Sequence, residues 1–434
     1  MKKITTIILV AGKSSRFKGS KSKIFHELAG LTIIEHIYNK AKKISNNDII
    51  FVCNKDNIEI LKKMFSNCKF ALQKHQKGTA DAVLSAKKFL RKNSNILILF
   101  GDVPLVNLNT LIKLKNNFFK NKLHGSMLAF NAKNPFAYGR VLTLKNKVIS
   151  VVEELNATNE IRKISLCNAG ILICKYSLLF SYIKKIENKN IKKEKYLPDI
   201  FNISHQNNQS FNYILCDENE MLGVNTLHDF NKIDKIYQEL LINKLIKKGV
   251  NIINPSTVRV SYDTIIGKNS IIEPFVIIAK GVKIGSQVII KSYSNIDSSH
   301  IGNNCSIGPY ARLRPFSKID EKSKIGNFVE IKNSKIGKNT SISHLSYIGD
   351  SSLGRNVNIG AGTITCNFDG KNKHKTIIEN NVFVGSNCSL VAPIKIKRNS
   401  KIGAGSVITK NIPSNSLALT RPKLIIKKKI NKNR

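Results

Sequence analysis

An aliphatic residue recurs at every sixth position through the C-terminal part of this chain. The series begins at Ile266, and each sixth residue up to Ile296 is again an isoleucine. Three five-residue steps then shift the frame, which resumes at Ile378 after an interruption and continues to Ile408. A period of six is neither the 3.6 of an α-helix nor the 2 of a strand. It is typical of a hexapeptide solenoid, in which each short strand points one aliphatic side chain into a shared core.

The first half of the chain follows a different rhythm, alternating strand-like and helix-like runs. We expect strands over 5–10, 48–53, 96–100 and 125–131, and helices over 32–44, 79–90 and 108–120. This alternation predicts a parallel sheet covered by helices on both faces. A capping-box pattern at Thr226 and Asp229 starts a further helix, which stops before Gly249. That helix either joins two domains or closes the first one. The predicted parts are an α/β domain over 1–225, a linker helix over 226–249 and a β-helix over 250–434.

The net charge of +43 favours a polyanionic partner such as RNA when it is taken alone. However, the excess is spread along the chain, and Lys, Asn and Ile are abundant together, as in proteins of AT-rich genomes. There is no basic motif interleaved with aromatic residues. We therefore expect no specific nucleic-acid partner, and we expect the basic tail 423–434 to be a solvated end.

Cysteine usage and hydropathy indicate the cellular setting. The eight cysteines contain no Cys-x-x-Cys pair, so neither a zinc site nor a disulfide framework is expected. A reducing cytoplasm is the predicted compartment. No run approaches the eighteen apolar residues that cross a bilayer, so no membrane insertion is expected.

A small-residue loop follows the first predicted strand, from Leu9 to Arg16, with Lys23 seven residues further on. Such a loop lets backbone N–H groups approach a phosphate, and the two cations suit a triphosphate. Asp102 ends another apolar strand, where α/β proteins bind ligands, and Asn225 could add a second oxygen. Mg²⁺ prefers such oxygen ligands. The simpler interpretation of Asp102 is a turn or helix-capping residue.

The solenoid carries polar groups on adjacent coils and one large break in its frame, over 365–375. A loop that leaves a rigid scaffold often bears function. Transfer of an acetyl group to an amine needs a base that titrates near neutrality, and His344 is the candidate. The simpler interpretation is a surface histidine without a role.

Taken in order, these motifs resemble the sugar-nucleotide pyrophosphorylases. The resemblance rests on the segments 9–16, 100–102, 138–140, 168–170 and 223–225, together with Lys23, Gln73, Gly78, Thr79 and Glu153. With the hexapeptide repeats added, the chain closely resembles bifunctional bacterial enzymes that acetylate glucosamine 1-phosphate and then uridylylate the product. The resemblance implies a Rossmann-like nucleotidyltransferase domain followed by a left-handed parallel β-helix.

For the first half, the resemblance implies Mg²⁺-dependent uridylyl transfer from UTP to N-acetylglucosamine 1-phosphate. Arg16 and Lys23 would stabilise the leaving pyrophosphate, and Asp102 and Asn225 would hold the metal. The implied nucleotide and sugar contacts are Leu9, Val10, Ala11, Gly12, Lys23, Gln73, Gly78, Thr79, Phe100, Gly101, Asp102, Gly139, Glu153, Asn168 and Asn225.

For the solenoid, the resemblance implies acetyl transfer from acetyl-CoA with His344 as the base. Glucosamine 1-phosphate would be bound by Arg314, Lys332, Tyr347, Asn358 and Lys373. Acetyl-CoA would contact Ala361, Asn367, Phe368, Ser386, Ala404 and Arg421. The resemblance also implies a homotrimer formed through this domain, with acetyl-transfer sites between subunits.

The sequence departs from the family pattern at Val10, Ser14, Ser22, Phe100 and Phe368. The family usually has Ala, Gly, Pro, Tyr and Tyr at these positions. Ser14 matters most, because Gly can adopt backbone angles that cost Ser energy. One alternative is a uridylyltransferase whose β-helix only trimerises it. A second is a non-catalytic assembly or RNA-binding protein, against which the phosphate-binding and metal-binding residues argue.

Overall fold

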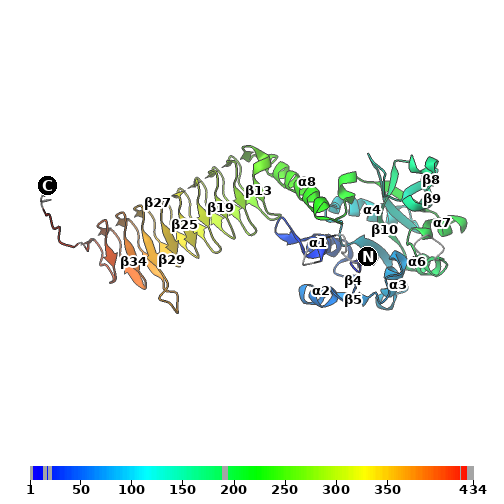
Figure 1. The fold of residues 1–434 in the computed structure, drawn as a ribbon, viewed down its shortest axis with the longest axis horizontal. Helices are drawn as coiled ribbons and strands as arrows, with labels where there is room; N and C mark the ends of the chain where they lie inside the picture. Colours follow the sequence, from blue (N-terminus) through cyan, green and yellow to red (C-terminus); the bar gives the residue numbers. More distant parts are fainter. Residues whose placement is uncertain (1–2, 13–16, 18–21, 188–193, 421, 428–434) are drawn as a thin grey trace, which may run out of the picture. The chain divides into compact units, whose positions relative to one another are not determined.

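The computed structural model describes residues 3–12, 17, 22–187, 194–420 and 422–427. The chain forms two compact units, residues 1–236 and 237–434 (Figure 1). The first unit is an α/β domain and the second is a solenoid, so the predicted fold class is confirmed.

A nine-stranded sheet forms the centre of the first unit, in the order β5-β4-β1-β6-β10-β7-β11-β9-β8. Its strands are β1 (Ile4–Leu9), β4 (Ile49–Cys53), β5 (Lys69–Leu72), β6 (Asn95–Phe100), β7 (Gly125–Asn131), β8 (Arg140–Leu144), β9 (Lys147–Val152), β10 (Leu166–Lys175) and β11 (Phe211–Leu215). A separate hairpin joins β2 (Glu27–Leu28) and β3 (Leu31–Thr32).

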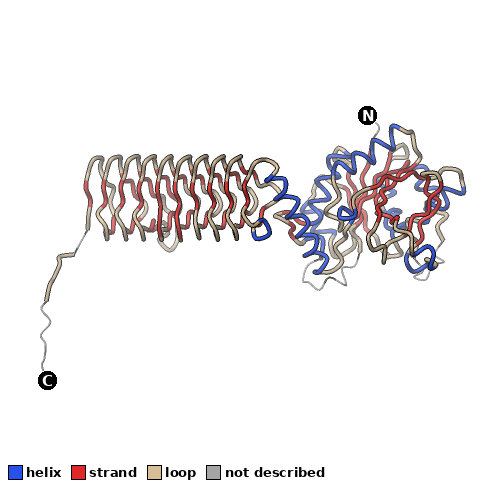
Figure 2. Tube along the Cα trace, turned by 90° about the horizontal axis from the view of Figure 1, so that it is seen from above, coloured by secondary structure: helices blue, strands red, loops and turns tan. Residues whose placement is uncertain are grey.

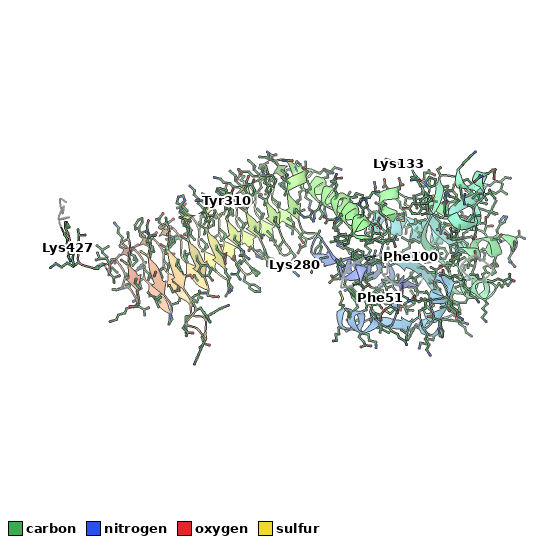
Figure 3. The ribbon with its side chains drawn as sticks, viewed as in Figure 1. Phe51, Phe100, Lys133, Lys280, Tyr310 and Lys427 are labelled. Atoms are coloured by element: carbon green, nitrogen blue, oxygen red, sulfur yellow. The ribbon has the colours of Figure 1, made fainter. Side chains whose placement is uncertain are left out.

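Helices cover both faces of this sheet, and each face has its own apolar core. On one face, Phe51 of β4 stacks against Phe65 and Phe70 inside the domain (Figure 3). The helices are α1 (Ile33–Ser45), α2 (Ile58–Met64), α3 (Thr79–Ser85), α4 (Leu108–Lys120), α5 (Asn159–Arg162), α6 (Tyr176–Ile183) and α7 (Asp199–Gln206). Short 3₁₀ turns are η1 (Lys23–Phe25), η2 (Lys87–Phe89), η3 (Glu154–Asn156) and η4 (Glu218–Met221).

Two expectations for this domain are corrected. The sheet is mixed, because β10 runs antiparallel to both β6 and β7. A buried apolar run has the same pattern in either direction, so the sequence does not reveal strand polarity. The helix expected over 79–90 ends at Ser85, whose hydroxyl donates to the Asp81 carbonyl at 3.0 Å. Such a side-chain bond competes with the helix backbone.

A long helix, α8 (Leu227–Ile246), contains the division between the two units. It begins with the predicted capping box: Asp229 N donates to Thr226 Oγ1 at 3.1 Å, and Thr226 N donates to Asp229 Oδ2 at 2.9 Å. It ends before Gly249, whose φ of +87° suits a glycine after a helix. In the part of the chain that the structure describes, no helix has the length and hydropathy that a bilayer crossing requires.

The second unit is a parallel β-helix with three strand faces and turns at the corners (Figure 2). The first face holds β12 (Asn251–Ile252), β15 (Ile271–Ile272), β18 (Ile289–Ile290), β21 (Ser306–Ile307), β24 (Lys324–Asn327), β27 (Ser341–His344), β30 (Asn358–Ile359), β33 (Phe383–Val384), β36 (Lys401–Ile402) and β38 (Leu417–Ala418). A 3₁₀ turn, η5 (Pro255–Thr257), follows β12.

The other two faces have the same construction. The second face holds β13 (Arg259–Val260), β16 (Ile277–Ile278), β19 (Asn295–Ile296), β22 (Arg312–Leu313), β25 (Glu330–Lys332), β28 (Tyr347–Gly349), β31 (Ile364–Cys366), β34 (Ser389–Val391) and β37 (Val407–Ile408). The third holds β14 (Ile265–Ile266), β17 (Lys283–Ile284), β20 (His300–Ile301), β23 (Lys318–Ile319), β26 (Lys335–Ile336), β29 (Ser351–Leu353), β32 (Thr376–Ile378) and β35 (Ile394–Ile396).

The six-residue frame matches this solenoid position by position. The aliphatic residues of the frame are buried in one continuous core. The three five-residue steps end at Ile301, Ile336 and Leu353, which all lie on the third face. Each short step therefore removes one residue from the same corner and leaves the core register unchanged. The predicted break is a loop between β31 and β32, closed by a bridge between Phe368 and Lys373.

Candidate active sites

The loop after β1 lies at the edge of the sheet where the neighbouring parallel strands also end. Side-chain amides fix its carbonyl groups. Asn57 Nδ2 donates to Val10 O at 2.7 Å, and Gln76 Nε2 donates to Ala11 O at 2.8 Å. The N–H of Gly101 donates to Leu9 O at 3.0 Å, which joins this loop to the end of β6.

Lys23, Asp102 and Asn225 converge at this edge from three distant parts of the sequence. Lys23 Nζ lies 2.6 Å from Asp102 Oδ2 and 3.3 Å from Asn225 Oδ1. The N–H of Val224 donates to Asp102 O at 2.9 Å, which holds the segment of Asn225 beside the end of β6. The two predicted metal ligands, Asp102 and Asn225, therefore face one common point, which the ammonium group of Lys23 occupies.

A cavity of about 350 Å³ opens beside Lys23 and Asp102. Its wall includes ten of the residues predicted to contact the nucleotide: Leu9, Val10, Ala11, Gly12, Lys23, Gln73, Gly78, Thr79, Phe100 and Asp102. Gly78 has a φ of +105°, and a Cβ there would come within 2.4 Å of Lys195 O. Glycine is therefore required at this position of the wall.

A second cavity, of about 500 Å³, shares Thr79 and Phe100 with the first. Two residues predicted to bind the sugar, Glu153 and Asn168, also line it. Gly139 lies beside Glu153, because a Cβ on Gly139 would come within 3.2 Å of Glu153 Oε1. The first unit thus has two adjacent cavities with a common wall, as two substrates that must meet require.

The donor set at Asp102 and Asn225 fits a magnesium ion. Mg²⁺ is usually held by one or two protein oxygens, with substrate phosphates and water completing its shell. Among the described residues there is no cluster of three or more His, Cys, Asp or Glu side chains that would form an all-protein site. Arg16, the second predicted phosphate cation, and Ser14 lie outside the described residues.

In the solenoid, His344 stands at the end of β27, directly beside Asn327 of β24. His344 Nδ1 lies 2.6 Å from the amide oxygen Asn327 Oδ1. An amide oxygen only accepts hydrogen bonds, so Nδ1 carries the proton, and in the neutral imidazole Nε2 then has the lone pair. The exposed Nε2 is then able to accept a proton from a substrate amine.

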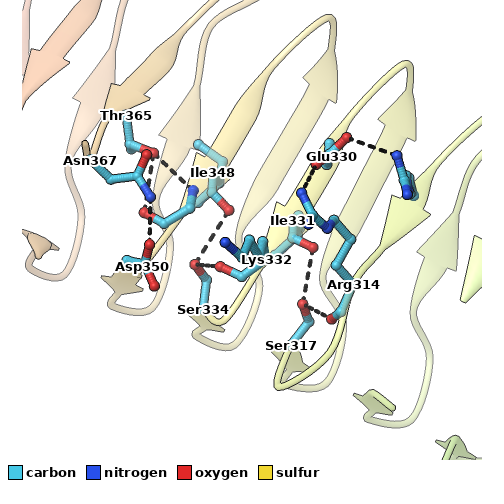
Figure 4. Close-up of polar contacts among 12 residues, drawn as sticks. Arg314, Ser317, Glu330, Ile331, Lys332, Ser334, Ile348, Asp350, Thr365 and Asn367 are labelled. Carbon is cyan, nitrogen blue, oxygen red and sulfur yellow. Dashed lines mark hydrogen bonds and ion pairs between the residues drawn. The ribbon is translucent and has the colours of Figure 1, made fainter. Parts of the chain in front are cut away.

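Cationic side chains gather on the second face, on the neighbouring coils. Arg314 Nη1 pairs with Glu330 Oε1 at 2.8 Å (Figure 4). Lys332 lies beside Lys373 of the loop, and a side-chain hydrogen bond with Lys373 lowers the pKa of Lys332 below its usual value. Partial desolvation and the charge of Lys373 lower that pKa further. Two neighbouring ammonium groups form an attractive place for a phosphate dianion.

Tyr347 lies on the same face, one coil beyond Glu330. A Cβ on Gly349 would come within 2.4 Å of the Tyr347 hydroxyl oxygen, so the ring lies flat across this glycine. The fifth residue predicted for the sugar phosphate, Asn358, lies elsewhere, on the first face with β27 as its neighbour. The predicted set is therefore divided between two faces of one chain.

The residues predicted to bind acetyl-CoA form two groups. Ala361, Ser386 and Ala404 occupy the same position of three successive coils, after the first-face strands β30, β33 and β36. Their small side chains leave room along the solenoid. Asn367 is buried, and its amide nitrogen donates to Asp350 Oδ2 at 2.5 Å (Figure 4). Phe368 is exposed in the loop, and Arg421 lies outside the described residues.

Three partners of the site residues were not predicted: Asn327 beside His344, Glu330 beside Arg314, and Asp350 beside Asn367. A signal for the first was present in the sequence. Before the loop, successive coils are offset by 17 or 18 residues, and Asn327 precedes His344 by 17. The other two depend on side-chain directions, which the repeat does not determine.

Fold and cavities together define a nucleotidyltransferase joined to a hexapeptide-repeat transferase. Comparison with known protein families gives the same two parts. Residues 6–166 match the MobA-like NTP transferase domain. Residues 263–298, 298–333 and 375–410 match the bacterial transferase hexapeptide family, described as six repeats.

Comparison with whole proteins extends the likeness to nearly the full chain. The bifunctional protein GlmU of Bartonella bacilliformis is 38% identical over 426 residues, covering 97% of this chain and 95% of the relative. The GlmU proteins of Thermosipho melanesiensis and Thermodesulfovibrio yellowstonii are each 40% identical, over 97% and 96% of this chain and 96% of each relative. The chain therefore belongs to the family of bifunctional GlmU proteins. It is a bifunctional transferase with nucleotidyltransferase and acetyltransferase activities, as predicted.

Proposed function

We propose that the two cavities of the first unit bind UTP and N-acetylglucosamine 1-phosphate side by side. The observation that carries this proposal is their common wall of Thr79 and Phe100, with Lys23 and Asp102 beside it. The smaller cavity takes the nucleotide against Leu9–Gly12 and Gln73. The larger one takes the sugar against Gly139, Glu153 and Asn168.

In this arrangement a phosphate oxygen of the sugar attacks the α-phosphorus of UTP in line, and pyrophosphate leaves. Lys23 and Arg16 neutralise the leaving group. Asp102 and Asn225 hold Mg²⁺, which supplies further charge neutralisation when it is bound. The protein does little covalent chemistry in such a transfer, so positioning and electrostatics provide the rate. Phe100 offers a ring without the hydroxyl group usual in the family.

The solenoid carries the acetyl transfer. His344 Nε2 removes a proton from the amino group of glucosamine 1-phosphate, and Asn327 keeps Nδ1 as the protonated nitrogen. Arg314, Lys332 and Lys373 bind the phosphate, while Tyr347 and Asn358 complete the sugar site. Acetyl-CoA lies along Ala361, Ser386 and Ala404, with Asn367, Phe368 and Arg421 as further contacts.

The division of these residues between two faces supports a homotrimer in which neighbouring chains complete each acetyl-transfer site. Closed rotational symmetry would place one face of each chain against another face of its neighbour. We assign the functional parts as residues 1–225, 226–249 and 250–434. The enzyme works in the cytoplasm, where its eight cysteines, all free in the structure, remain reduced.

Measuring the two half-reactions separately tests these assignments. Asp102→Ala should abolish pyrophosphate release from UTP and N-acetylglucosamine 1-phosphate yet leave CoA release from acetyl-CoA intact. His344→Ala should give the opposite pattern. Loss of both reactions in either variant would indicate misfolding, and normal CoA release by His344→Ala would remove His344 as the base.

A further inference from the structure

One buried charge lies behind the larger cavity of the first unit and has no part in the chemistry proposed above. Arg140 is the largest fully buried side chain of the described residues, with 2% of the side chain exposed. A buried cation is costly unless it is paired and hydrogen-bonded. The groups that Arg140 contacts therefore indicate the role of this buried side chain.

Arg140 pairs with Glu154, and each group also binds backbone of the segment just before β8. Arg140 Nη2 lies 2.7 Å from Glu154 Oε2, and Arg140 Nη1 donates to Tyr138 O. Glu154 Oε2 also accepts from Ala137 N at 3.2 Å. The hydrogen bond from Arg140 lowers the pKa of the Glu154 carboxyl, so the pair stays charged at neutral pH. One ion pair thus ties the segment before β8 to the segment after β9.

The position of Arg140 in the sheet relates it to all three proposed sugar residues. It is paired with Val152 of β9 and with Cys167 of β10. Gly139 precedes Arg140, Glu153 follows Val152, and Asn168 follows Cys167. A further bond, from Asn168 N to Gly139 O at 2.8 Å, joins two of these neighbours directly. Each of the three sugar residues is therefore adjacent in sequence to Arg140 or to one of its two partners in the sheet.

We propose that the Arg140–Glu154 pair is a positioning device that sets the geometry of the sugar-phosphate cavity. It holds the strand ends carrying Gly139, Glu153 and Asn168 at a fixed separation. Glu154 itself lines this cavity, whereas Arg140 does not. This proposal rests on the proposed function, in which the larger cavity binds N-acetylglucosamine 1-phosphate.

A purely structural pair would behave differently. Its loss would destabilise the whole domain and affect both substrates of uridylyl transfer alike. A positioning pair affects the sugar phosphate selectively, because the nucleotide cavity is built mainly on other elements: the ends of β1 and β6, and the segment from Gln73 to Ala82. The two roles are therefore separated by the KM values for the two substrates.

The test uses Glu154→Gln and Arg140→Lys in the full-length enzyme, with steady-state kinetics of pyrophosphate release. Glu154→Gln keeps the acceptor for Ala137 but removes the charge, and Arg140→Lys keeps the charge but removes the guanidinium fork. We expect the KM for N-acetylglucosamine 1-phosphate to rise about tenfold or more, since misplacement near 1 Å has effects of this size or larger. We expect the KM for UTP to change less than about twofold.

Arg162→Met is the matched control. Arg162 Nε also approaches Glu154, at 3.5 Å, but its side chain is 48% exposed. An exposed pair of this kind contributes little, so both KM values should stay at the wild-type level. Equal increases in both KM values for Glu154→Gln, or no increase in either, would overturn the proposal.

Glu153→Ala separates this proposal from the one on which it rests. If Glu153→Ala leaves the KM for the sugar phosphate unchanged, the larger cavity is not the sugar site and the proposed function fails. If Glu153→Ala raises that KM while Glu154→Gln and Arg140→Lys do not, only the positioning role fails. Because Glu154 lines this cavity, a rise in that KM for Glu154→Gln without one for Arg140→Lys would indicate a direct contact and overturn the positioning role. No rise for Glu154→Gln overturns it even if Arg140→Lys does not fold.

Discussion

At the scale of single residues, the hydrogen bond from His344 to Asn327 makes a specific prediction. Asn327→Ala removes the acceptor that keeps the proton on Nδ1, so the productive tautomer of His344 is no longer favoured. We expect kcat for acetyl transfer to fall about tenfold, equivalent to roughly 1.4 kcal/mol and close to the strength of one hydrogen bond. Stopped assays of CoA release measure this change.

Asn295→Ala is a suitable control for Asn327→Ala. Asn295 is an exposed residue on the second face, three coils before Tyr347 of β28, the strand that follows His344 in the chain. Its substitution should leave CoA release unchanged, and neither variant should alter pyrophosphate release. An undiminished kcat for Asn327→Ala would mean that the tautomer is fixed by another group.

Lys332 provides a prediction about pH. Its pKa is lowered in the folded protein, chiefly by Lys373, so the unfolded chain binds more protons and stability rises with pH between the folded and unfolded pKa values. In the proposed acetyl-transfer site, Lys332 binds the phosphate of glucosamine 1-phosphate in its charged form. We therefore expect the affinity to fall as the pH rises through this lowered pKa, and calorimetric titrations across alkaline pH will show the decline.

Lys373→Met tests the cause of that pH dependence. Without the neighbouring ammonium group, the pKa of Lys332 returns toward its ordinary value, so the decline in affinity should move to higher pH. Overall affinity should also be lower, since one cation is lost. A decline at the same pH in both proteins would show that another group titrates.

Several site residues were predictable individually, because position in the sequence gives their environment. Asp102 and the loop from Leu9 follow buried strands, and strand ends meet at one edge of an α/β sheet. The Lys23–Asp102 ion pair was not predicted, since it depends on how separate loops fold back. The sequence distinguishes Arg140 only as part of a motif, because a sequence does not reveal that a charged side chain is buried.

At the scale of elements, one corner of the β-helix carries a ladder of asparagines. Asn356 Nδ2 donates to Asn381 at 3.0 Å, and Asn381 Nδ2 donates to Asn399 at 3.1 Å. The φ of Asn381 is +59°, which non-glycine residues rarely adopt. Asn381→Ala should therefore lower the free energy of unfolding of the solenoid by about 2 kcal/mol, from strain and two lost bonds.

Asn381→Gly separates these two contributions. Glycine also loses the ladder bonds but adopts a positive φ without strain. It should destabilise the solenoid by about 1 kcal/mol, less than alanine does. Denaturant unfolding followed by circular dichroism measures both. If alanine were tolerated as well as glycine, backbone strain at this corner would not limit stability.

The elements themselves show which structural information a sequence contains. The six-residue frame predicted the core of the solenoid correctly, because one aliphatic side chain per strand must be buried. Helix α4 agrees with its predicted range, since its apolar face repeats regularly. The direction of β10 was not predictable, because burial is the same for either polarity. The exposed aromatic stack at another corner, including Tyr310 (Figure 3), was also not predicted, since it depends on coil register.

At the scale of the whole molecule, the distribution of residues over the β-helix bears on assembly. Lys332 and its cationic neighbours lie on the second face, whereas Ser386 belongs to the small-residue column of the first face. A repeat pattern gives the fold of each coil but not the surface at which coils of different chains meet. The proposed site between subunits therefore needs an experiment on mixed assemblies.

Lys332→Met and Ser386→Trp make such an experiment possible, since each should abolish acetyl transfer when every chain of the proposed trimer carries it. The first removes a cation of the proposed phosphate site, and the second fills the groove proposed for acetyl-CoA. In trimers formed from both variants, a shared site is intact under one condition. The chain that supplies Lys332 must carry Ser386→Trp, and the chain that supplies Ser386 must carry Lys332→Met. Random one-to-one mixing makes about a quarter of the sites intact, given closed symmetry with one site per interface.

Co-expression with two affinity tags, followed by assays of CoA release, should therefore recover about a quarter of wild-type activity. Pyrophosphate release should be normal in both parents and in the mixture. A mixture as inactive as its parents would place both residues in the same site of one chain.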